Sequence, residues 1–194
     1  MNRRNLLKCL GPPILMLFAG GCVGTKQRRT QIQIAENLNF KLLPPESFGQ
    51  KISVLQNVDL YYRNRIYKTL VQLEISRKWV SLVGFTSMGI RTFTIRWSGK
   101  DLLSESHLGN KIPFNPKHIF ADLQLALWPK ISIKTHLQIR ETSKPVPSRE
   151  VLRNGVPVLR IVYETKPAWR GKIEIQHFER DYRLQISPLR INNK

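Results

Sequence analysis

Cys22 is the residue whose chemistry can be named most readily from its neighbours. It follows Ala19-Gly20-Gly21 at the end of an apolar stretch, residues 10–19, and basic side chains precede that stretch in residues 1–8. A basic start, an apolar core and then small residues are typical of a secretory signal peptide. The apolar core is shorter than the ~20 residues that span a bilayer, so a permanent transmembrane helix is not expected. A thiol at this position is a nucleophile that can accept a lipid group.

The four residues from Ala19 to Cys22 resemble the lipobox of bacterial lipoproteins. The resemblance implies a signal peptide over residues 1–21, cleavage between Gly21 and Cys22, and lipidation of Cys22 as the new N-terminus. Val23 stands where lipoproteins kept in the inner membrane typically carry aspartate, so the implied destination is the outer membrane, facing the periplasm. Cys9 leaves with the signal, which would leave Cys22 without a disulfide partner. An ordinary secretory signal with an incidental cysteine is the alternative.

A second pair of residues, His118 and Asp122, has the spacing of an orienting pair on one helical face. The same spacing suits a polar strip that faces solvent, or a capping network. The chain has no G-x-S-x-G nucleophile turn and no glycine-rich phosphate loop. Its four histidines, His107, His118, His136 and His177, lack metal-ligand spacing. We therefore predict no enzyme activity, no cofactor and no metal site.

The chain carries a net charge of +19, and removal of a signal with three basic residues and no acidic one would leave +16. Such a charge is typical of nucleic-acid binding in the cytosol, but an exported, anchored protein rarely meets nucleic acid. Anionic phospholipid headgroups are the second partner, at about 1 kcal/mol per basic residue near the surface. Lys26, Arg28 and Arg29, just after the expected anchor, are well placed for them. A surface rich in basic residues without a specific partner is the third interpretation.

The remaining chain divides into a polar segment and a long region of β periodicity. We expect residues 22–49 to form the lipid anchor and a tether, because they are polar and end near Pro44-Pro45. From residue 52, apolar and polar residues alternate as in half-buried strands. Short turns between successive strands favour an antiparallel meander. Strands are predicted at 52–62, 66–76, 79–86, 90–97, 101–105, 136–142, 149–153, 156–164, 171–179 and 182–187.

One helix interrupts these strands. Asn115-Pro116 supplies a cap and a first-turn proline, and the predicted helix over residues 117–128 stops at Pro129. Apolar side chains cover most of its circumference and leave a narrow polar strip at His118, Asp122 and Gln124. A helix this apolar must be buried against a broad surface, and the sheet is the only one that the pattern offers. The sequence therefore predicts a mainly β, α+β fold: a curved antiparallel sheet with an apolar helix against it.

Three stretches carry a family resemblance: residues 82–95, residues 121–129 and Trp169-Arg170-Gly171. They resemble an uncharacterised family of bacterial outer-membrane lipoproteins, related in architecture to the lipoprotein-localisation proteins LolA and LolB. The resemblance implies that residues 50–194 form an incomplete β-barrel whose concave face holds an acyl chain and the helix. Proteins of this kind accept lipid-modified cargo and pass it into the outer membrane. Relatives are often encoded beside fatty-acid-like or aryl-polyene synthesis genes, which suggests a lipid cargo other than lipoproteins.

Ten apolar side chains are candidates for the lining of a lipid cavity, and the same side chains would serve a solid core. A sheet of about ten strands encloses more apolar surface than one short helix fills, which favours a cavity. LolB proteins insert an apolar loop into the membrane, and residues 87–90 are the candidate here. The expected function is a membrane-anchored carrier or acceptor of an acyl chain, and the alternative is a structural envelope subunit without a ligand. The ten candidates are Val71, Leu73, Ile75, Phe93, Ile95, Trp97, Phe120, Leu123, Leu127 and Trp128.

Overall fold

The computed structural model describes residues 25–27, 30–107, 115–133 and 137–192. One α-helix, α1 (Pro116–Leu127), and three 3₁₀ helices, η1 (Pro45–Phe48), η3 (Lys130–Ser132) and η4 (Ala168–Arg170), accompany the strands in this part of the chain. The strands are β1 (Thr25–Gln27), β2 (Gln31–Ala35), β3 (Leu38–Lys41), β4 (Ile52–Tyr62), β5 (Arg65–Ile75), β6 (Val80–Phe85), β7 (Arg91–Trp97), β8 (Leu102–Ser106), β9 (Gln138–Thr142), β10 (Ser148–Arg153), β11 (Val156–Tyr163), β12 (Ile173–His177) and β13 (Tyr182–Asn192).

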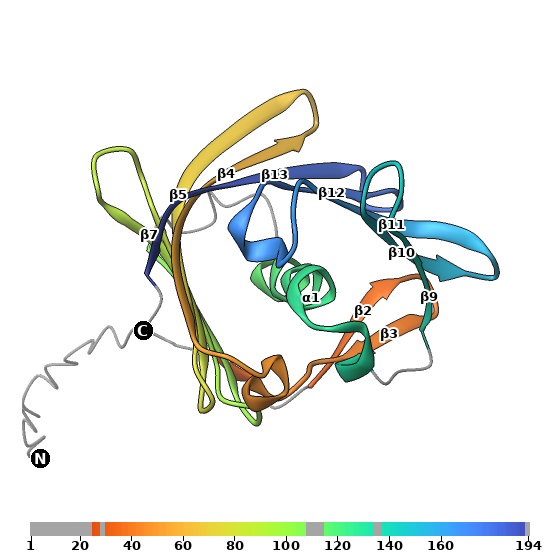
Figure 1. The fold of residues 1–194 in the computed structure, drawn as a ribbon. Helices are drawn as coiled ribbons and strands as arrows, with labels where there is room; N and C mark the ends of the chain where they lie inside the picture. Colours follow the sequence, from red (N-terminus) through yellow and green to blue (C-terminus); the bar gives the residue numbers. More distant parts are fainter. Residues whose placement is uncertain (1–24, 28–29, 108–114, 134–136, 193–194) are drawn as a thin grey trace, which may run out of the picture.

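Most strands belong to one antiparallel sheet, with the order β1-β8-β7-β6-β5-β4-β13-β12-β11-β10-β9. Two meanders, β4 to β8 and β9 to β13, are joined where β4 pairs with β13. The sheet does not close: within the described residues it ends at the three-residue β1 on one side and at β9 on the other. Figure 1 shows this sheet curving around α1, with the short β2–β3 hairpin on the side near β9. The prediction of a mainly β fold, with an antiparallel sheet and one helix, is confirmed.

Alternation along the strands explains which side of the sheet is buried. On β5 the residues Val71, Leu73 and Ile75 are buried, while Gln72 and Glu74 between them are only half-buried. The helix lies on this buried side, as Figure 1 shows, with η4 in contact with it. Period-two patterning therefore directs one apolar face of the wall toward an apolar helix. No helix in the described part of the chain is long and apolar enough to cross a membrane.

Both ends of α1 are held by side chains. At the start, Asn115 Oδ1 accepts a hydrogen bond from the Lys117 backbone N–H at 3.1 Å, as the sequence predicts. At the other end, the buried Arg149 donates to the carbonyl oxygens of Leu125 and Trp128, and the Tyr163 hydroxyl donates to Ala126 O at 2.9 Å. A guanidinium beside the last carbonyls also opposes the negative end of the helix dipole. Strands β10 and β11 thus fix the helix inside the sheet.

The expected tether over residues 22–49 is wrong for residues 30–48, which are part of the folded body. Ile34 and Phe40 on the β2–β3 hairpin are almost completely buried in the core. Leu43 then exchanges two hydrogen bonds with the Gln124 side chain, at 2.8 and 2.9 Å, so this segment is tied directly to α1. The apolar residues here alternate over only a few positions between polar ones, too short a pattern to outweigh the overall polarity.

The predicted strand positions are otherwise close to those observed, and the differences have local causes. The largest is at β13, which continues to Asn192 instead of ending at residue 187. The predicted strand ends directly before Pro188, and in the structure a register shift between Pro188 and Arg190 accommodates this proline as a bulge. The Asn154-Gly155 turn between β10 and β11 has φ angles of 52° and 80° at its two residues. Both are positive, as a type I′ hairpin turn requires.

Candidate functional site

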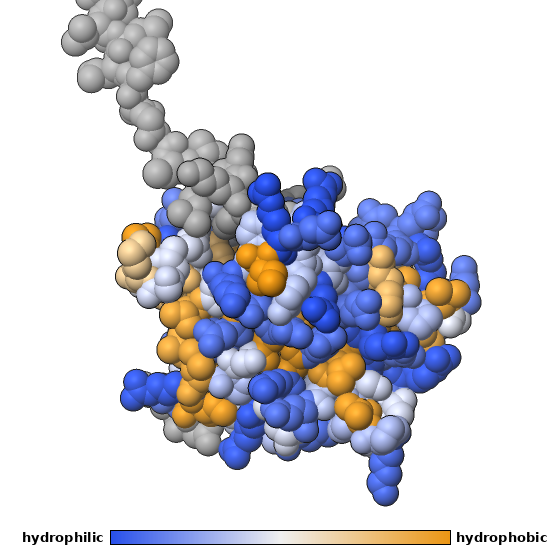
Figure 2. Space-filling model, turned by 90° about the horizontal axis from the view of Figure 1, so that it is seen from above, coloured by the Kyte–Doolittle hydropathy of each residue, from blue (hydrophilic) through white to orange (hydrophobic). Residues whose placement is uncertain are grey.

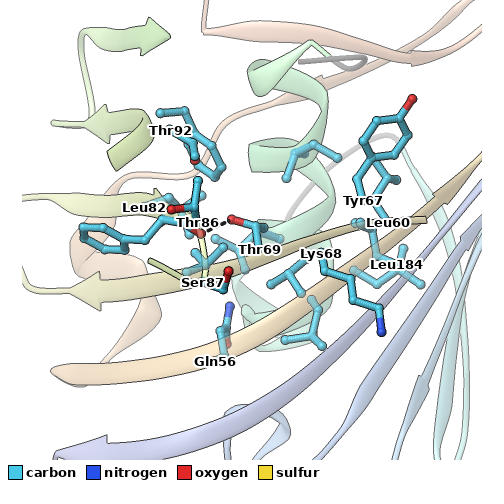
Figure 3. A pocket seen from close by; sticks show the side chains of 18 residues that line it. Gln56, Leu60, Tyr67, Lys68, Thr69, Leu82, Thr86, Ser87, Thr92 and Leu184 are labelled. Atoms are coloured by element: carbon cyan, nitrogen blue, oxygen red, sulfur yellow. Dashed lines mark hydrogen bonds between the residues drawn. The ribbon is translucent and has the colours of Figure 1, made fainter. Parts of the chain in front are cut away.

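An apolar cavity of about 290 Å³ lies between α1 and the concave side of the sheet. Its volume is near the lower end of the range for small-molecule sites, about 300–1,000 Å³. Figure 3 looks into it, with Thr69, Thr86 and Ser87 close together on one side and Leu60, Tyr67 and Leu184 on the other. The lining side chains are Gln56, Val58, Leu60, Tyr67, Lys68, Thr69, Val71, Leu82, Phe85, Thr86, Ser87, Thr92, Phe93, Ile119, Leu123, Ile175, Leu184 and Ile186.

Helix α1 contributes Ile119 and Leu123 to the cavity, two residues four positions apart on one helical face. The opposite wall comes from β4 to β7, and the central strands β13 and β12, next to β4, add Leu184, Ile186 and Ile175. Inward positions of neighbouring strands lie side by side, so a helix that covers only part of the face leaves the remainder as empty apolar space. The cavity is thus a consequence of one short helix facing a wide sheet.

A glycine in the wall shapes the cavity. Gly84 on β6 is paired across the sheet with Phe93 on β7, and the Phe93 ring lies over the glycine α-carbon. A β-carbon built on Gly84 would come within 2.2 Å of a Phe93 ring atom. Because glycine leaves this space free, Phe93 can lie against the wall and still line the cavity.

Polar side chains are a minority of the cavity lining, and two of them illustrate how far they are hydrogen-bonded. Thr69 Oγ1 donates a hydrogen bond to Phe85 O at 2.9 Å, so its bonding capacity is partly used. Thr92 Oγ1, by contrast, is buried and has no hydrogen-bond partner among the residues that the structure describes. Buried hydroxyls are normally hydrogen-bonded, so an unpaired one beside a cavity is a position where a bound molecule could supply the partner.

The structure places the ten predicted cavity residues in three groups. Val71, Phe93 and Leu123 line the cavity. Leu127 and Trp128 line a different hollow near the C-terminal end of α1. The other five belong to the buried core and do not line this cavity, which is the alternative that the sequence left open for them: Leu73, Ile75, Ile95, Trp97 and Phe120.

Four of these residues are on the inward face of the sheet, but farther along their strands than the cavity, and Phe120 is on a different face of α1 from Ile119 and Leu123. Leu73 and Ile75 are farther along β5 than Val71, toward the end of the sheet against which the segment around Leu43 packs. Trp97 illustrates this directly, because its indole N–H donates to Leu43 O at 2.7 Å. The prediction missed Val58 and Leu60 on β4 and Ile186 on β13, although their alternation was visible in the sequence.

The polar strip of α1 does not face solvent, so that interpretation is wrong. Asp122 and Gln124 have no exposed surface. Asp122 Oδ2 accepts a hydrogen bond from the Tyr182 hydroxyl, while Oδ1 has no partner among the described residues. Burial raises the pKa of Asp122 to about 7, against the opposing effects of the Tyr182 hydrogen bond and the nearby Arg180. Loss of solvation outweighs both because the carboxyl lies entirely inside the protein.

A second hollow, of about 280 Å³, adjoins this carboxyl at the N-terminal end of α1. Leu60, Tyr62, Asn115, His118, Ile119, Arg180 and Tyr182 line it, and two of these, Leu60 and Ile119, also line the apolar cavity. Burial and then the Arg180 charge lower the pKa of His118 to about 4. The same two causes lower the pKa of His177, which contacts Arg180, to about 4. Both rings are therefore neutral at pH 7, and Arg180 is the cation of this cluster.

Metal ions require a set of several ligand side chains close together. Among the described residues, no three His, Cys, Asp or Glu side chains come together as a set that could hold a metal ion. His107 is exposed at the end of β8, and His136 lies outside the described residues. The predicted cleavage and lipidation site, Gly21 and Cys22, also lies outside them.

Exposed apolar residues gather at one end of the strands, where several turns lie side by side. Antiparallel pairing puts four turns at this same end of the sheet: β4–β5, β6–β7, β10–β11 and β12–β13. Met88, 81% exposed, and Ile90, 56% exposed, are in the β6–β7 turn directly after cavity-lining residues. Ile66, Val156 and Phe178 are exposed beside the other three turns. Figure 2, which views the molecule from above, shows a largely hydrophilic surface with separate hydrophobic patches.

The chain matches a protein family over most of the region that forms the sheet and the helix. Residues 53–190 match the model of a family described as protein of unknown function DUF3261. The chain belongs to this family. The DUF3261 match begins in β4 and ends in β13, and it therefore includes α1 and every residue that lines the apolar cavity. Comparison with curated proteins finds no match.

Proposed function

We propose that this DUF3261 chain is a carrier or acceptor that binds one acyl chain, or a comparable slender lipid group, in the apolar cavity under α1. The single observation that carries the proposal is the cavity of about 290 Å³, lined mainly by apolar side chains and placed between the helix and the sheet. Apolar cavities of this kind stay dry and bind apolar molecules. The few polar atoms that reach it suit orientation of a ligand better than chemistry, and the proposed role is binding without catalysis.

The proposal includes a relation to LolA and LolB in architecture, and the open, curved sheet around one helix is the observation in its favour. In this proposal the open sheet is an incomplete β-barrel, and α1 is the helix that partly plugs its concave face. The ligand in this proposal lies between the helix and the sheet. The proposed cargo is a fatty-acid-like or aryl-polyene lipid, in keeping with the expectation from the sequence.

The proposed location is the periplasmic face of the outer membrane, with Cys22 as the lipid anchor. Val23 is central to this assignment, so Val23→Asp should retain the protein in the inner membrane, and unchanged fractionation would contradict the route. The exposed tips at Met88 and Ile90 then provide an apolar contact with the bilayer next to the cavity. Arg65 and Arg91 are basic residues at the same end of the strands as these tips, and they suit anionic headgroups.

The experiment that tests binding begins with full-length protein purified from its own membrane. The protein is extracted in mild detergent, and mass spectrometry then identifies non-covalently bound compounds after the anchor mass has been accounted for. An acyl compound at about one per protein is the expected result. The stripped protein should then bind a fluorescent fatty-acid probe with the same stoichiometry. Absence of both would exclude the carrier function.

A structural envelope subunit without a ligand is the second candidate. The observation in its favour is the edge strand β9, whose residues are largely exposed and whose outer side has no strand partner within the described residues. Unpaired edges are templates for pairing with another chain. A stable protein partner recovered by crosslinking through β9, together with an empty cavity, would favour this role.

A further inference from the structure

We infer that the ligand is an amphiphile with an acidic head, whose carboxylate or phosphate binds Arg180 while its apolar tail occupies the cavity under α1. The inference rests on the proposed function and adds the chemistry of the head group. It starts from the hollow of about 280 Å³ at the N-terminal end of α1, which Arg180, His118 and Tyr182 line. A cationic hollow next to an apolar cavity matches a molecule that is charged at one end only.

The two hollows adjoin each other. Leu60 on β4 and Ile119 on α1 line both of them, so the side chains that end the apolar cavity also begin the polar hollow. Ile119 is half-buried, and Leu60 belongs to the core. Leu60 and Ile119 thus stand between the two hollows, and the proposal has the ligand chain run from Leu123 past Ile119 to Arg180.

The charge of Arg180 has no counter-ion close by. Arg180 forms no ion pair with any residue in the part of the chain that the structure describes. Its neighbour Glu179 is engaged elsewhere, by Arg153 at 2.6 Å and by the Glu36 backbone N–H at 2.9 Å. Asp122 is the nearby buried carboxyl, and burial raises its pKa to about 7, so that it is largely without charge below neutral pH. A half-buried guanidinium without a full counter-charge favours an anionic ligand.

Arg180 also retains unused hydrogen-bond donors. The Arg180 backbone N–H lies 3.3 Å from His177 Nδ1, and His177 Nε2 lies 2.9 Å from Ile34 O. We therefore assign the proton of the neutral ring to Nε2, which donates to Ile34 O. The guanidinium nitrogen at 2.9 Å from Nε2 then has no acceptor there. The other terminal nitrogen donates to Gln33 O, and the guanidinium also interacts with the Tyr182 side chain. A guanidinium has five N–H donors, so these contacts leave donors for a ligand oxygen.

The positive end of the helix points to the same hollow. Asn115 and His118, from the cap and the first turn of α1, line it. The N-terminus of a helix carries a partial positive charge that stabilises an anion. Helix and guanidinium therefore act together on one acidic group.

The test compares ligands that differ only in the head group. Full-length protein, stripped of bound lipid, is titrated with cis-parinaric acid and with its methyl ester. Loss of a charge-assisted hydrogen bond predicts that the acid binds about ten- to a hundred-fold more tightly than the ester. Arg180→Met should remove this difference by weakening the acid alone, and Arg180→Lys should restore part of it. Arg183→Met is the matched control, since Arg183 lies over the Tyr61 ring, outside the residues that line either hollow.

Competition experiments identify the acidic group and its tail. Dodecanoate, dodecyl phosphate, dodecanol and inorganic phosphate compete against the bound acid. The proposal is supported if dodecanoate, dodecyl phosphate or both displace the acid at concentrations well below those that dodecanol and inorganic phosphate require. The dodecyl anion that displaces it at the lower concentration identifies the preferred acidic group, carboxylate or phosphate. Equal binding of acid and ester, or an Arg180→Met variant that still prefers the acid, would overturn the head-group site and leave the proposed function intact. Binding of neither probe would reject the proposed function itself.

Discussion

Replacing Leu123 with tryptophan distinguishes a ligand cavity from a filled core, and Leu125 provides the matched control. Both leucines are buried on α1, two positions apart. Leu123 lines the apolar cavity, whereas Leu125 is completely buried in the core cluster and lines none of the hollows described above. The same substitution therefore adds a large ring to empty space at one site and to filled space at the other.

The expected energies follow from this difference. Extra volume in a close-packed core typically costs about 1–3 kcal/mol and sometimes more, so Leu125→Trp should lose about 3 kcal/mol. For a domain of this size that corresponds to a fall of about 6–12 °C in Tm. At position 123 the ring can enter the cavity of about 290 Å³ and bury further apolar surface. We expect Leu123→Trp to stay within about 1 kcal/mol of the wild type, since apolar burial, at about 25 cal/mol per Å², offsets the local repacking.

Two measurements on each variant decide the matter. Thermal or denaturant unfolding of the lipid-stripped protein gives the change in stability, and titration with a fluorescent fatty-acid probe gives the change in binding. Leu123→Trp should keep its stability and lose probe binding, whereas Leu125→Trp should lose stability. Equal destabilisation by the two variants, with probe binding unchanged in Leu123→Trp, would refute the assignment of this space as the ligand site.

Four further predictions follow from individual contacts. Between about pH 4.5 and 6, unfolding releases the proton of the buried Asp122, whose pKa is raised to about 7 in the folded protein. Unfolding also adds one proton to each of His118 and His177, whose pKa values are lowered to about 4 by burial. The net result is an uptake of one proton. Stability should therefore rise with pH by about 1.4 kcal/mol per unit, and by about 2.7 in Asp122→Asn; identical slopes would contradict the buried neutral carboxyl. Gly84→Ala should push the Phe93 ring into the cavity, lowering stability by about 1–3 kcal/mol and weakening probe binding, and unchanged affinity would argue against the observed ring position. Cys22→Ser should release the protein from membranes and abolish labelling by fatty acid, whereas persistent membrane fractionation without label in the wild type would disprove the anchor. Met88→Asp should weaken the binding of Cys22→Ser protein to anionic vesicles without changing its Tm, and equal binding would exclude this hairpin tip as a membrane contact.

The elements with strong local signals could be predicted from the sequence. Strand β4 has the predicted bounds, because eleven residues of alternation outweigh any local ambiguity. The start of α1 follows from the capping side chain of Asn115 and the proline after it. The β2–β3 hairpin was missed because its strands are short and its burial depends on distant elements, such as α1, which contacts β2, and His177, whose Nε2 lies 2.9 Å from Ile34 O. Tertiary contacts of that kind leave no periodic signal.

The candidate site could be predicted only in part, for a geometric reason. Alternation identifies the inward face of a strand, and Val71, Leu73 and Ile75 do share one. It does not reveal how far along that face the helix and the β2–β3 hairpin reach, so it cannot separate Val71, beside the cavity, from Leu73, in the core. Asp122 shows the same limit, since its hydrogen bond comes from Tyr182, sixty residues away.

Photo-crosslinking tests the central claim, that a lipid tail occupies the cavity under α1, most directly. Full-length protein is incubated with a fatty acid that carries a photoreactive diazirine near the end of its chain, irradiated, digested and mapped by mass spectrometry. The account predicts crosslinks on cavity-lining residues of β5 and α1, such as Val71 and Leu123, which unlabelled fatty acid suppresses. Crosslinks confined to exposed positions such as Leu189, or labelling that an excess of unlabelled fatty acid leaves unchanged, would contradict it.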